Sequence, residues 1–139
     1  MTVGTSCDCN SGIVTVKLLD KGQVVASAKG VQGKELRLSV QNPTLWSPSN
    51  PYLYDMTVSL SKDGKVLDEV KSYTAFRKIS SKRDAAGIMR MQLNNQDLFQ
   101  FGPLDQGWWP DGLYTAPTDE ALLFDIKKTK DWGFNMIRK

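Results

Sequence analysis

A chain of 139 residues with 40% hydrophobic residues can bury a real core, and it suits one ordinary domain or a small domain plus part of another. Its 18 basic residues are spread among 15 acidic ones, so no basic block is long enough to follow a phosphate backbone, which argues against nucleic-acid binding. The absence of histidine from the sequence excludes Ser-His-Asp triads and the usual zinc ligand sets, and it leaves acid-base chemistry to carboxylates.

The N-terminal segment MTVGTSCDCN contains both cysteines of the chain. Cys7 and Cys9 are separated only by Asp8, too close to bridge without strain and too few for a metal site, so we assign them no role. The segment lacks the charged and apolar regions of a secretory signal, and no run of about 18 apolar residues predicts a membrane helix. We expect both ends of the chain to be cuts, which leaves the compartment open, a periplasmic or secreted parent included.

Residues 11–80 consist of short β-branched and aliphatic runs separated by turn residues, a spacing typical of a β-sandwich. Gly12–Leu19 alternates, a turn follows at Asp20–Gly22, and Gln23–Ala28 is the return strand. A third strand, Lys34–Val40, places three core candidates on one face: Leu36, Leu38 and Val40.

A second pair of strands is predicted on either side of Asp63-Gly64, a type I′ hairpin signal. The first strand is Tyr52–Leu60 and the second is Lys65–Ile79. The inward face of the first strand comprises Tyr52, Tyr54, Met56, Val58 and Leu60. Because about five strands are fewer than the roughly seven of an immunoglobulin-like sandwich, we expect the first one or two to lie upstream of Met1 or to survive as Thr2–Thr5.

After the polar stretch Ser80–Ala86 the pattern changes to a hairpin followed by a long loop. The hairpin strands are Gly87–Leu93 and Gln96–Phe101, joined by Asn94-Asn95. The next segment, Gly102–Pro117 (GPLDQGWWPDGLYTAP), holds three glycines, three prolines and two adjacent tryptophans, and this composition predicts an irregular loop.

The last predicted elements are a helix and a short strand. Thr118 is a suitable N-cap, two acidic residues follow it, and the helix should run to about Trp132. Gly133 suits the position after the helix end, and Phe134–Arg138 reads as a short buried strand. The inward stripe of the helix comprises Leu122, Ile126 and Thr129.

Four segments resemble, in order and spacing, parts of family 2 glycoside hydrolases. LWSPSNPYLY at residues 45–54 resembles the signature of the immunoglobulin-like domain that precedes the catalytic barrel in that family. DEVKSYTAFRK at 68–78, LNNQDLF at 93–99 and GFNMIR at 133–138 agree with it, and the last resembles the family's first barrel strand. The resemblance covers residues 12–139 and implies a mainly β fold, with an immunoglobulin-like β-sandwich at residues 1–80. Residues 81–139 would then hold a hairpin, a loop, one helix and the first strand of a truncated (β/α)8 barrel.

The resemblance also implies that the parent protein is a retaining exo-β-glycosidase of the β-galactosidase, β-glucuronidase or β-mannosidase kind. Members of the family use two glutamates at the ends of later barrel strands, which this chain does not contain. We therefore expect no catalytic residue, metal or cofactor here and no hydrolysis by the chain alone; its partners would be a β-glycoside substrate and the rest of the barrel. Where many members have Arg-Gly and, beyond it, Asn-Arg-His, this chain has FGPLDQ at 101–106, which indicates a subgroup and leaves the sugar open.

Candidate sugar-binding residues cluster in the predicted loop, because sugars stack on indoles and hydrogen-bond to carboxylates. They are Asp105, Gln106, Trp108, Trp109 and Asp111. The alternative is that the tryptophans only pack the loop against the barrel mouth. A catalytic pair of Asp105 and Asp111 is a minor alternative, since its carboxyl groups would have to lie about 5 Å or about 6.5–9.5 Å apart.

Arg138 is assigned to the substrate pocket by the resemblance, because Asn135–Arg138 matches the family's N-x-[IV]-R pattern at the C-terminal end of a barrel strand. A second role, compatible with the first, is an ion pair with a neighbouring carboxylate that fixes the strand end. Trp46 is interpreted as a plug at a sandwich edge or a domain interface, and Arg77 as an ordinary solvated or interface charge.

A stand-alone carbohydrate-binding β-sandwich module is the alternative function. The tail discriminates between the two, because a lone strand at Phe134–Ile137 leaves backbone groups without a neighbour, which suits a barrel fragment better than a module. We expect that strand to be disordered, to fold back on the sandwich, or to pair with another copy of the chain.

Overall fold

The computed structural model describes residues 2–3 and 12–139, so Cys7 and Cys9 lie outside the described residues. The chain divides into two compact units, Met1–Arg77 and Lys78–Lys139, which we call the sheet unit and the helix unit. The dividing point precedes residues 80–81, where the sequence predicted a domain boundary.

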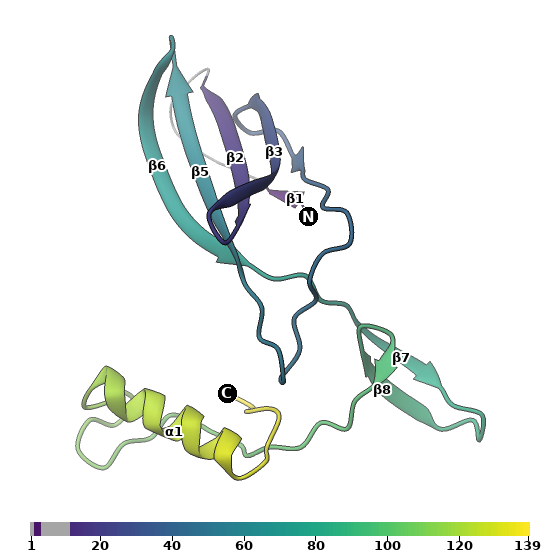
Figure 1. Cartoon of the computed structure of the whole chain (residues 1–139). Coiled ribbons are helices and arrows are strands. Elements are labelled where there is room, and N and C mark those ends of the chain that lie inside the picture. Colours follow the sequence, from purple (N-terminus) through teal and green to yellow (C-terminus); the bar gives the residue numbers. More distant parts are fainter. Residues whose placement is uncertain (1, 4–11) are drawn as a thin grey trace. The chain divides into compact units, whose positions relative to one another are not determined.

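Four long antiparallel strands form the main sheet of the sheet unit, in the order β3-β2-β5-β6 (Figure 1). Their bounds are Ile13–Asp20 (β2), Gln23–Val31 (β3), Tyr54–Lys62 (β5) and Lys65–Thr74 (β6). The β5–β6 hairpin turns through Asp63 (φ 50°) and Gly64 (φ 78°), two consecutive residues with positive φ. This is the type I′ geometry that matches the twist of the strands, so the predicted Asp63-Gly64 hairpin is confirmed.

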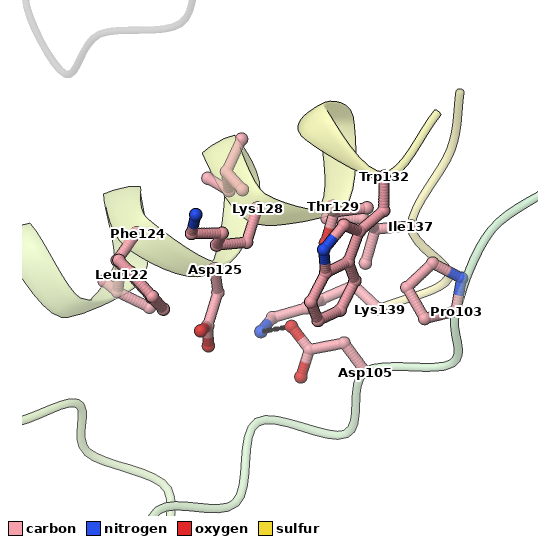
Figure 2. Close-up of a pocket in the computed structure, with 11 residues that line it drawn as sticks. Pro103, Asp105, Leu122, Phe124, Asp125, Lys128, Thr129, Trp132, Ile137 and Lys139 are labelled. Carbon is pink, nitrogen blue, oxygen red and sulfur yellow. Dashed lines mark hydrogen bonds and ion pairs between the residues drawn. The ribbon is translucent and has the colours of Figure 1, made fainter. Parts of the chain in front are cut away.

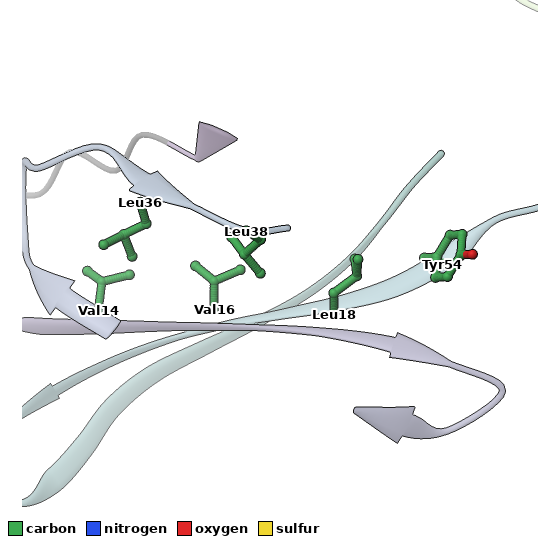
Figure 3. Close-up of a cluster of buried hydrophobic side chains, with 6 residues drawn as sticks. All are labelled: Val14, Val16, Leu18, Leu36, Leu38 and Tyr54. Atoms are coloured by element: carbon green, nitrogen blue, oxygen red, sulfur yellow. The ribbon is translucent and has the colours of Figure 1, made fainter. Parts of the chain in front are cut away.

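A short second layer covers one face of this sheet and encloses the core. It contains β1 (Thr2–Val3), which pairs with β4 (Leu36–Arg37), and the chain that follows β4. Figure 3 shows Leu36 and Leu38 lying over Val14 and Val16 of β2. The buried core comprises Val14, Val16, Leu18, Leu36, Leu38 and Tyr54. Each such side chain contributes about 1.5–3 kcal/mol on full burial, so this cluster is what holds the two layers together.

The predicted core face is largely confirmed, but one predicted strand is shorter than expected. Of the residues predicted to face inward, Tyr54 is buried in the core, and those partly buried against it are Val40, Tyr52, Met56, Val58 and Leu60. Only Leu36–Arg37 of the predicted strand Lys34–Val40 is regular, because β1 supplies a partner for those two residues alone.

Residues 45–54, which carry the sandwich signature, are bonded to the chain that follows β6. The backbone N–H of Trp46 donates to the carbonyl oxygen of Phe76 at 2.9 Å. The Arg77 guanidinium carbon lies 5.1 Å from the centroid of the Trp46 ring, a cation–π contact within the sheet unit. Trp46 and Arg77 therefore contact one another, a pairing that the sequence did not indicate.

Two tyrosine hydroxyls bond this segment to neighbouring residues, one through a side chain and one through the backbone. The Tyr52 hydroxyl donates to the Asp20 carboxylate at the end of β2, and the Tyr54 hydroxyl accepts from the N–H of Thr44 at 2.9 Å. The hydrogen bond to Asp20 is the main reason that the pKa of Tyr52 is raised to about 12.

The helix unit begins with a small antiparallel sheet in the order β7-β8-β9. Its strands are Ile79–Arg83 (β7), Met89–Leu93 (β8) and Gln96–Asp97 (β9). The predicted strand Lys65–Ile79 is therefore wrong at its end: β6 stops at Thr74, and Ile79 begins β7. The predicted polar stretch contains most of β7, which is largely exposed and so lacks the apolar alternation that reveals a half-buried strand.

The β8–β9 hairpin turns through Asn94 (φ 53°) and Asn95 (φ 66°), which confirms the predicted turn. The return strand is much shorter than the predicted Gln96–Phe101, because the chain leaves β8 after Leu98 donates to Met91. It continues into the segment that pairs with the C-terminal tail.

Helix α1 (Asp119–Asp131) confirms the predicted helix. The Thr118 hydroxyl caps its first turn by accepting from the N–H of Ala121 at 3.2 Å, and Gly133 (φ 85°) follows its last turn in the left-handed conformation. None of its residues, all of which are described, is buried, so the predicted inward stripe does not face a closed core. No helix in the described part of the chain is long and apolar enough to cross a membrane.

The C-terminal tail is not the unpartnered strand that the sequence predicted. It runs parallel to residues 101–105: the N–H of Asn135 donates to Phe101 O at 3.0 Å, and the N–H of Arg138 donates to Pro103 O at 3.0 Å. The expectation was wrong because glycine and proline at 102–103 made the partner segment read as loop. Since these tail groups are bonded within their own chain, pairing with another copy is not supported.

Candidate functional site

Two parallel segments, residues 101–105 and 134–138, are joined in sequence by a long loop and α1. An isolated parallel bridge links Leu104 to Arg138, and the N–H of Asp105 donates to Arg138 O at 2.8 Å. Both segments therefore end at the same edge. In barrels and open sheets of parallel strands, the loops at this C-terminal edge form the ligand site, so it is the first place to look for function.

The side-chain amide of Asn135 completes the parallel pair. Its Oδ1 accepts from the N–H of Phe101 at 2.9 Å, and its Nδ2 donates to the carbonyl oxygen of Phe99 at 2.8 Å. Phe101 and Phe134 also pack together, with ring centroids 4.8 Å apart. The asparagine of the N-x-[IV]-R pattern thus has a structural role here: it replaces the ladder bonds that a short, irregular pair lacks.

The side chain of Asp105 is held at the edge by two contacts, one to each carboxylate oxygen. Its Oδ1 accepts from the N–H of Gly107 at 2.7 Å, and its Oδ2 lies 2.6 Å from the Lys139 ammonium. Lys139, and then the Gly107 N–H, lower the pKa of the Asp105 carboxyl below its ordinary value. The group is therefore a fixed, ionised acceptor.

The loop that follows Asp105 presents its two tryptophans differently. Trp109 is half-buried and exchanges backbone bonds with Leu113, its N–H donating at 2.7 Å and its carbonyl accepting at 3.2 Å. Trp108 is exposed and packs against Tyr114, with ring centroids 4.6 Å apart. Asp111 is exposed within the turn that Trp109 and Leu113 close.

Arg138 ends the second parallel segment with an exposed side chain. Its backbone makes the parallel bridge, but among the described residues the ion pair at this edge belongs to Lys139 and Asp105. The sequence offered an ion pair between Arg138 and a neighbouring carboxylate, without naming it, whereas the structure pairs Lys139 with Asp105.

An apolar groove of about 700 Å³ runs between α1 and the ends of the parallel segments. Figure 2 shows Asp105 and Lys139 pointing toward one another in it, with Trp132 and other helix residues on the opposite side. Of the five predicted sugar-binding residues, Asp105 lines this groove. Trp109 and Asp111 line a separate hollow of about 220 Å³ beside the turn. Gln106, Trp108 and Arg138 line neither of these two hollows, so the predicted residues are not gathered in one pocket.

Sequence reasoning missed Tyr114 and Lys139, and it noted Asn135 only as part of the N-x-[IV]-R pattern, without the structural role that its contacts show. The basic dipeptide that ends the chain offered a signal for Lys139, since either cation could pair with an upstream carboxylate. Tyr114 and Asn135 are distinguished only by contacts that depend on the loop and the parallel pair. In the described part of the chain, no three acidic, cysteine or histidine side chains are grouped so as to hold a metal ion.

The sequence profile described as Glycosyl hydrolases family 2 matches residues 5–77, more than half of the chain. The chain belongs to glycoside hydrolase family 2. This family 2 chain is 28% identical to a β-galactosidase of Lactococcus lactis subsp. lactis, over 88% of its own length and 11% of that protein. It is 30% identical to a putative β-glucuronidase of Formosa agariphila, over 74% of its length and 10% of that protein.

Solved structures agree with the predicted fold. A β-glycosidase from Bacteroides vulgatus matches 94% of this family 2 chain with a TM-score of 0.80 and 27% identity, over 16% of its own chain. A β-glucuronidase from Ruminococcus gnavus matches 99% with a TM-score of 0.77 over 25% of its chain, and at 21% identity it supports the fold alone. The predicted family and the mainly β sandwich-type fold are confirmed. The chain spans only 10–18% of the length of the curated relatives named β-galactosidase or β-glucuronidase that it matches first.

Proposed function

We propose that this chain is a non-catalytic part of a retaining exo-β-glycosidase, with the sheet unit as scaffold and the helix unit as one wall of the sugar pocket. The meeting of Asp105 and Arg138 at the C-terminal edge of two parallel segments, from which the tryptophan loop departs, is the observation that carries the proposal. Enzymes built on parallel β-α units place their active-site loops at that edge. In this assignment residues 1–80 correspond to the sandwich domain, and residues 81–139 correspond to the start of the barrel.

Asp105 suits substrate binding better than acid catalysis. A glycosidase general acid needs a raised pKa so that it stays protonated near neutral pH, whereas the Lys139 ammonium lowers the pKa of Asp105. A fixed carboxylate is instead a strong acceptor for sugar hydroxyls. The ionised group would therefore orient the sugar ring rather than protonate the leaving oxygen.

The three glutamates of the chain occupy structural positions rather than the positions of catalytic acids. Glu35 forms an exposed ion pair with Arg37, and Glu69 lies on the exposed strand β6. Glu120 lies in the first turn of α1, where its own backbone N–H and the Thr118 hydroxyl lower its pKa. None of these arrangements resembles the facing carboxyl pair, about 5 Å apart, that a retaining mechanism requires. The catalytic acids of the proposed enzyme would therefore come from other parts of the protein.

A β-linked pyranoside is the proposed substrate class, since similar proteins are named β-galactosidase, β-glucuronidase or β-glycosidase. The alternative of a stand-alone carbohydrate-binding module is less favoured. The helix unit contains a partnered parallel pair with a connecting helix, which is the building block of a barrel rather than of a sandwich.

The proposal is tested by comparing two proteins: this 139-residue chain and the product of the complete open reading frame that encodes it. Both are assayed with 4-nitrophenyl β-galactoside, β-glucuronide and β-mannoside. We expect the complete product to hydrolyse at least one of these with retention of the anomeric configuration, and the chain alone to give the rate of the buffer blank. Turnover by the chain alone, or a complete product inactive on all three, would contradict the proposal.

A further inference from the structure

The loop of the helix unit carries an exposed pair of aromatic rings. Trp108 and Tyr114 are 59% and 72% exposed, and their rings are tilted at 48° with centroids 4.6 Å apart. Trp109, although adjacent in sequence, is half-buried and takes no part in the pair. Large aromatic side chains that meet each other while facing solvent are a surface on which a ligand can displace water.

The loop is closed in a way that fixes both rings before any ligand binds. Trp109 and Leu113 exchange backbone hydrogen bonds, so the residues on either side of them, Trp108 and Tyr114, leave the closed turn at adjacent points. The N–H of Thr115 then donates to Gly112 O at 2.9 Å. A side chain at Gly112 would overlap the Thr115 carbonyl, so the turn depends on glycine there. A preformed pair loses little conformational entropy on binding.

We infer that Trp108 and Tyr114 together form an aromatic platform that stacks on the apolar face of a pyranoside ring. This inference rests on the proposed function and deepens it. A pyranose ring presents C–H groups on one face, and an aromatic surface complements that face. Tyr114 thereby joins the binding surface, and Trp109 becomes a residue that holds the turn.

The test is a titration of the 139-residue chain with methyl β-D-galactopyranoside and with methyl β-D-glucuronide, followed by saturation-transfer NMR and by the indole ¹⁵N shifts of the tryptophans. We expect saturation of the sugar ring protons and movement of the Trp108 indole signal. Tyr114→Ala should raise the Kd for the sugar about three- to tenfold, the effect expected from the loss of one aromatic contact. Tyr114→Phe should bind like the wild type. Tyr73→Ala is the matched control and should bind like the wild type, because Tyr73 is also an exposed tyrosine but lies on β6 of the sheet unit.

Two results would overturn the platform: no saturation transfer to either sugar from the wild-type chain, or binding that Tyr114→Ala leaves unchanged while the amide spectrum shows it folded. If Tyr114→Ala does not fold, the wild-type titration provides the test instead. A Trp108 indole ¹⁵N signal that does not move at saturating sugar would then contradict the platform. Neither result depends on hydrolysis by the complete open reading frame product, so failure of the platform and failure of the proposed function are distinguishable.

Discussion

The carboxylate of Asp105 joins the loop to the C-terminal tail. One oxygen accepts from the backbone of Gly107 and the other meets the ammonium of Lys139, while the N–H of Asp105 is bonded to the tail backbone. The side chains of this ion pair are 64% and 36% exposed, for Lys139 and Asp105 respectively, so solvent screens it and it contributes little to stability. Its effect is on charge and position: it keeps an acceptor ionised at the edge of the proposed sugar site.

Replacing Lys139 by Met should raise the pKa of Asp105 toward its ordinary value. In the wild type, the pKa of Asp105 is lower in the folded chain than in the unfolded chain. The ionised carboxylate therefore stabilises the folded chain at pH values above its unfolded-state pKa, and this stabilisation is lost as the pH falls through its folded-state pKa. Wild type and variant should therefore differ slightly in stability near neutral pH and converge in acid. A ¹³C NMR titration of the Asp105 carboxyl measures the shift, with Lys130→Met on α1 as the control. If the titration midpoint of Asp105 is the same in Lys139→Met as in the wild type, the ion pair does not lower the pKa of Asp105.

At the scale of elements, the parallel pair depends on close backbone contact between Gly102 and Met136. A Cβ on Gly102 would overlap the Met136 carbonyl oxygen, so the pair could not keep its present spacing. The backbone hydrogen bonds donated by Asn135 and Arg138 lie on either side of this contact and depend on the same close spacing of the two segments.

Gly102→Ala should accordingly destabilise the helix unit by about 1–3 kcal/mol, the usual cost of overpacking. Hydrogen exchange at the amides of Asn135 and Arg138 reports the loss directly, since both should exchange faster. Gln100→Ala, at an exposed neighbouring position, is the matched control and should leave their protection unchanged. Equal protection in Gly102→Ala and wild type would show that the two segments are not held as described.

Elements with a local signal were predicted well. Asp63-Gly64 and Asn94-Asn95 form their hairpins because positive φ at two consecutive positions is a local property, and α1 begins at Thr118 for the same kind of reason. The alternating core of β2 and β5 follows from one buried face. Strand β7 was missed because its partner, not its own composition, makes it a strand.

At the scale of the whole molecule, the sequence identified the family and the segments that contain the candidate site, but not the contacts that assemble the site. Asp105 was recognised by residue type, whereas its partner Lys139 is distant in sequence and is found only through the parallel pair. The tryptophans were recognised together, although backbone pairing turns one inward and leaves the other exposed. The division into sheet unit and helix unit at Arg77 and Lys78 follows from backbone contacts, whereas the boundary expected at residues 80–81 came from the family resemblance.

The central claim is that the edge formed by Asp105 and Arg138 is the sugar-binding end of the protein. Its most direct test is kcat/KM for the preferred 4-nitrophenyl β-glycoside in the complete open reading frame product carrying Arg138→Ala. Loss of a charged hydrogen-bonding group is worth about 1.5–3 kcal/mol, so we expect about a tenfold to hundredfold fall in kcat/KM with little change in Tm. Arg37→Ala, which removes an exposed arginine of the sheet unit, should leave kcat/KM unchanged. An Arg138→Ala enzyme that is folded and as active as wild type would contradict the claim.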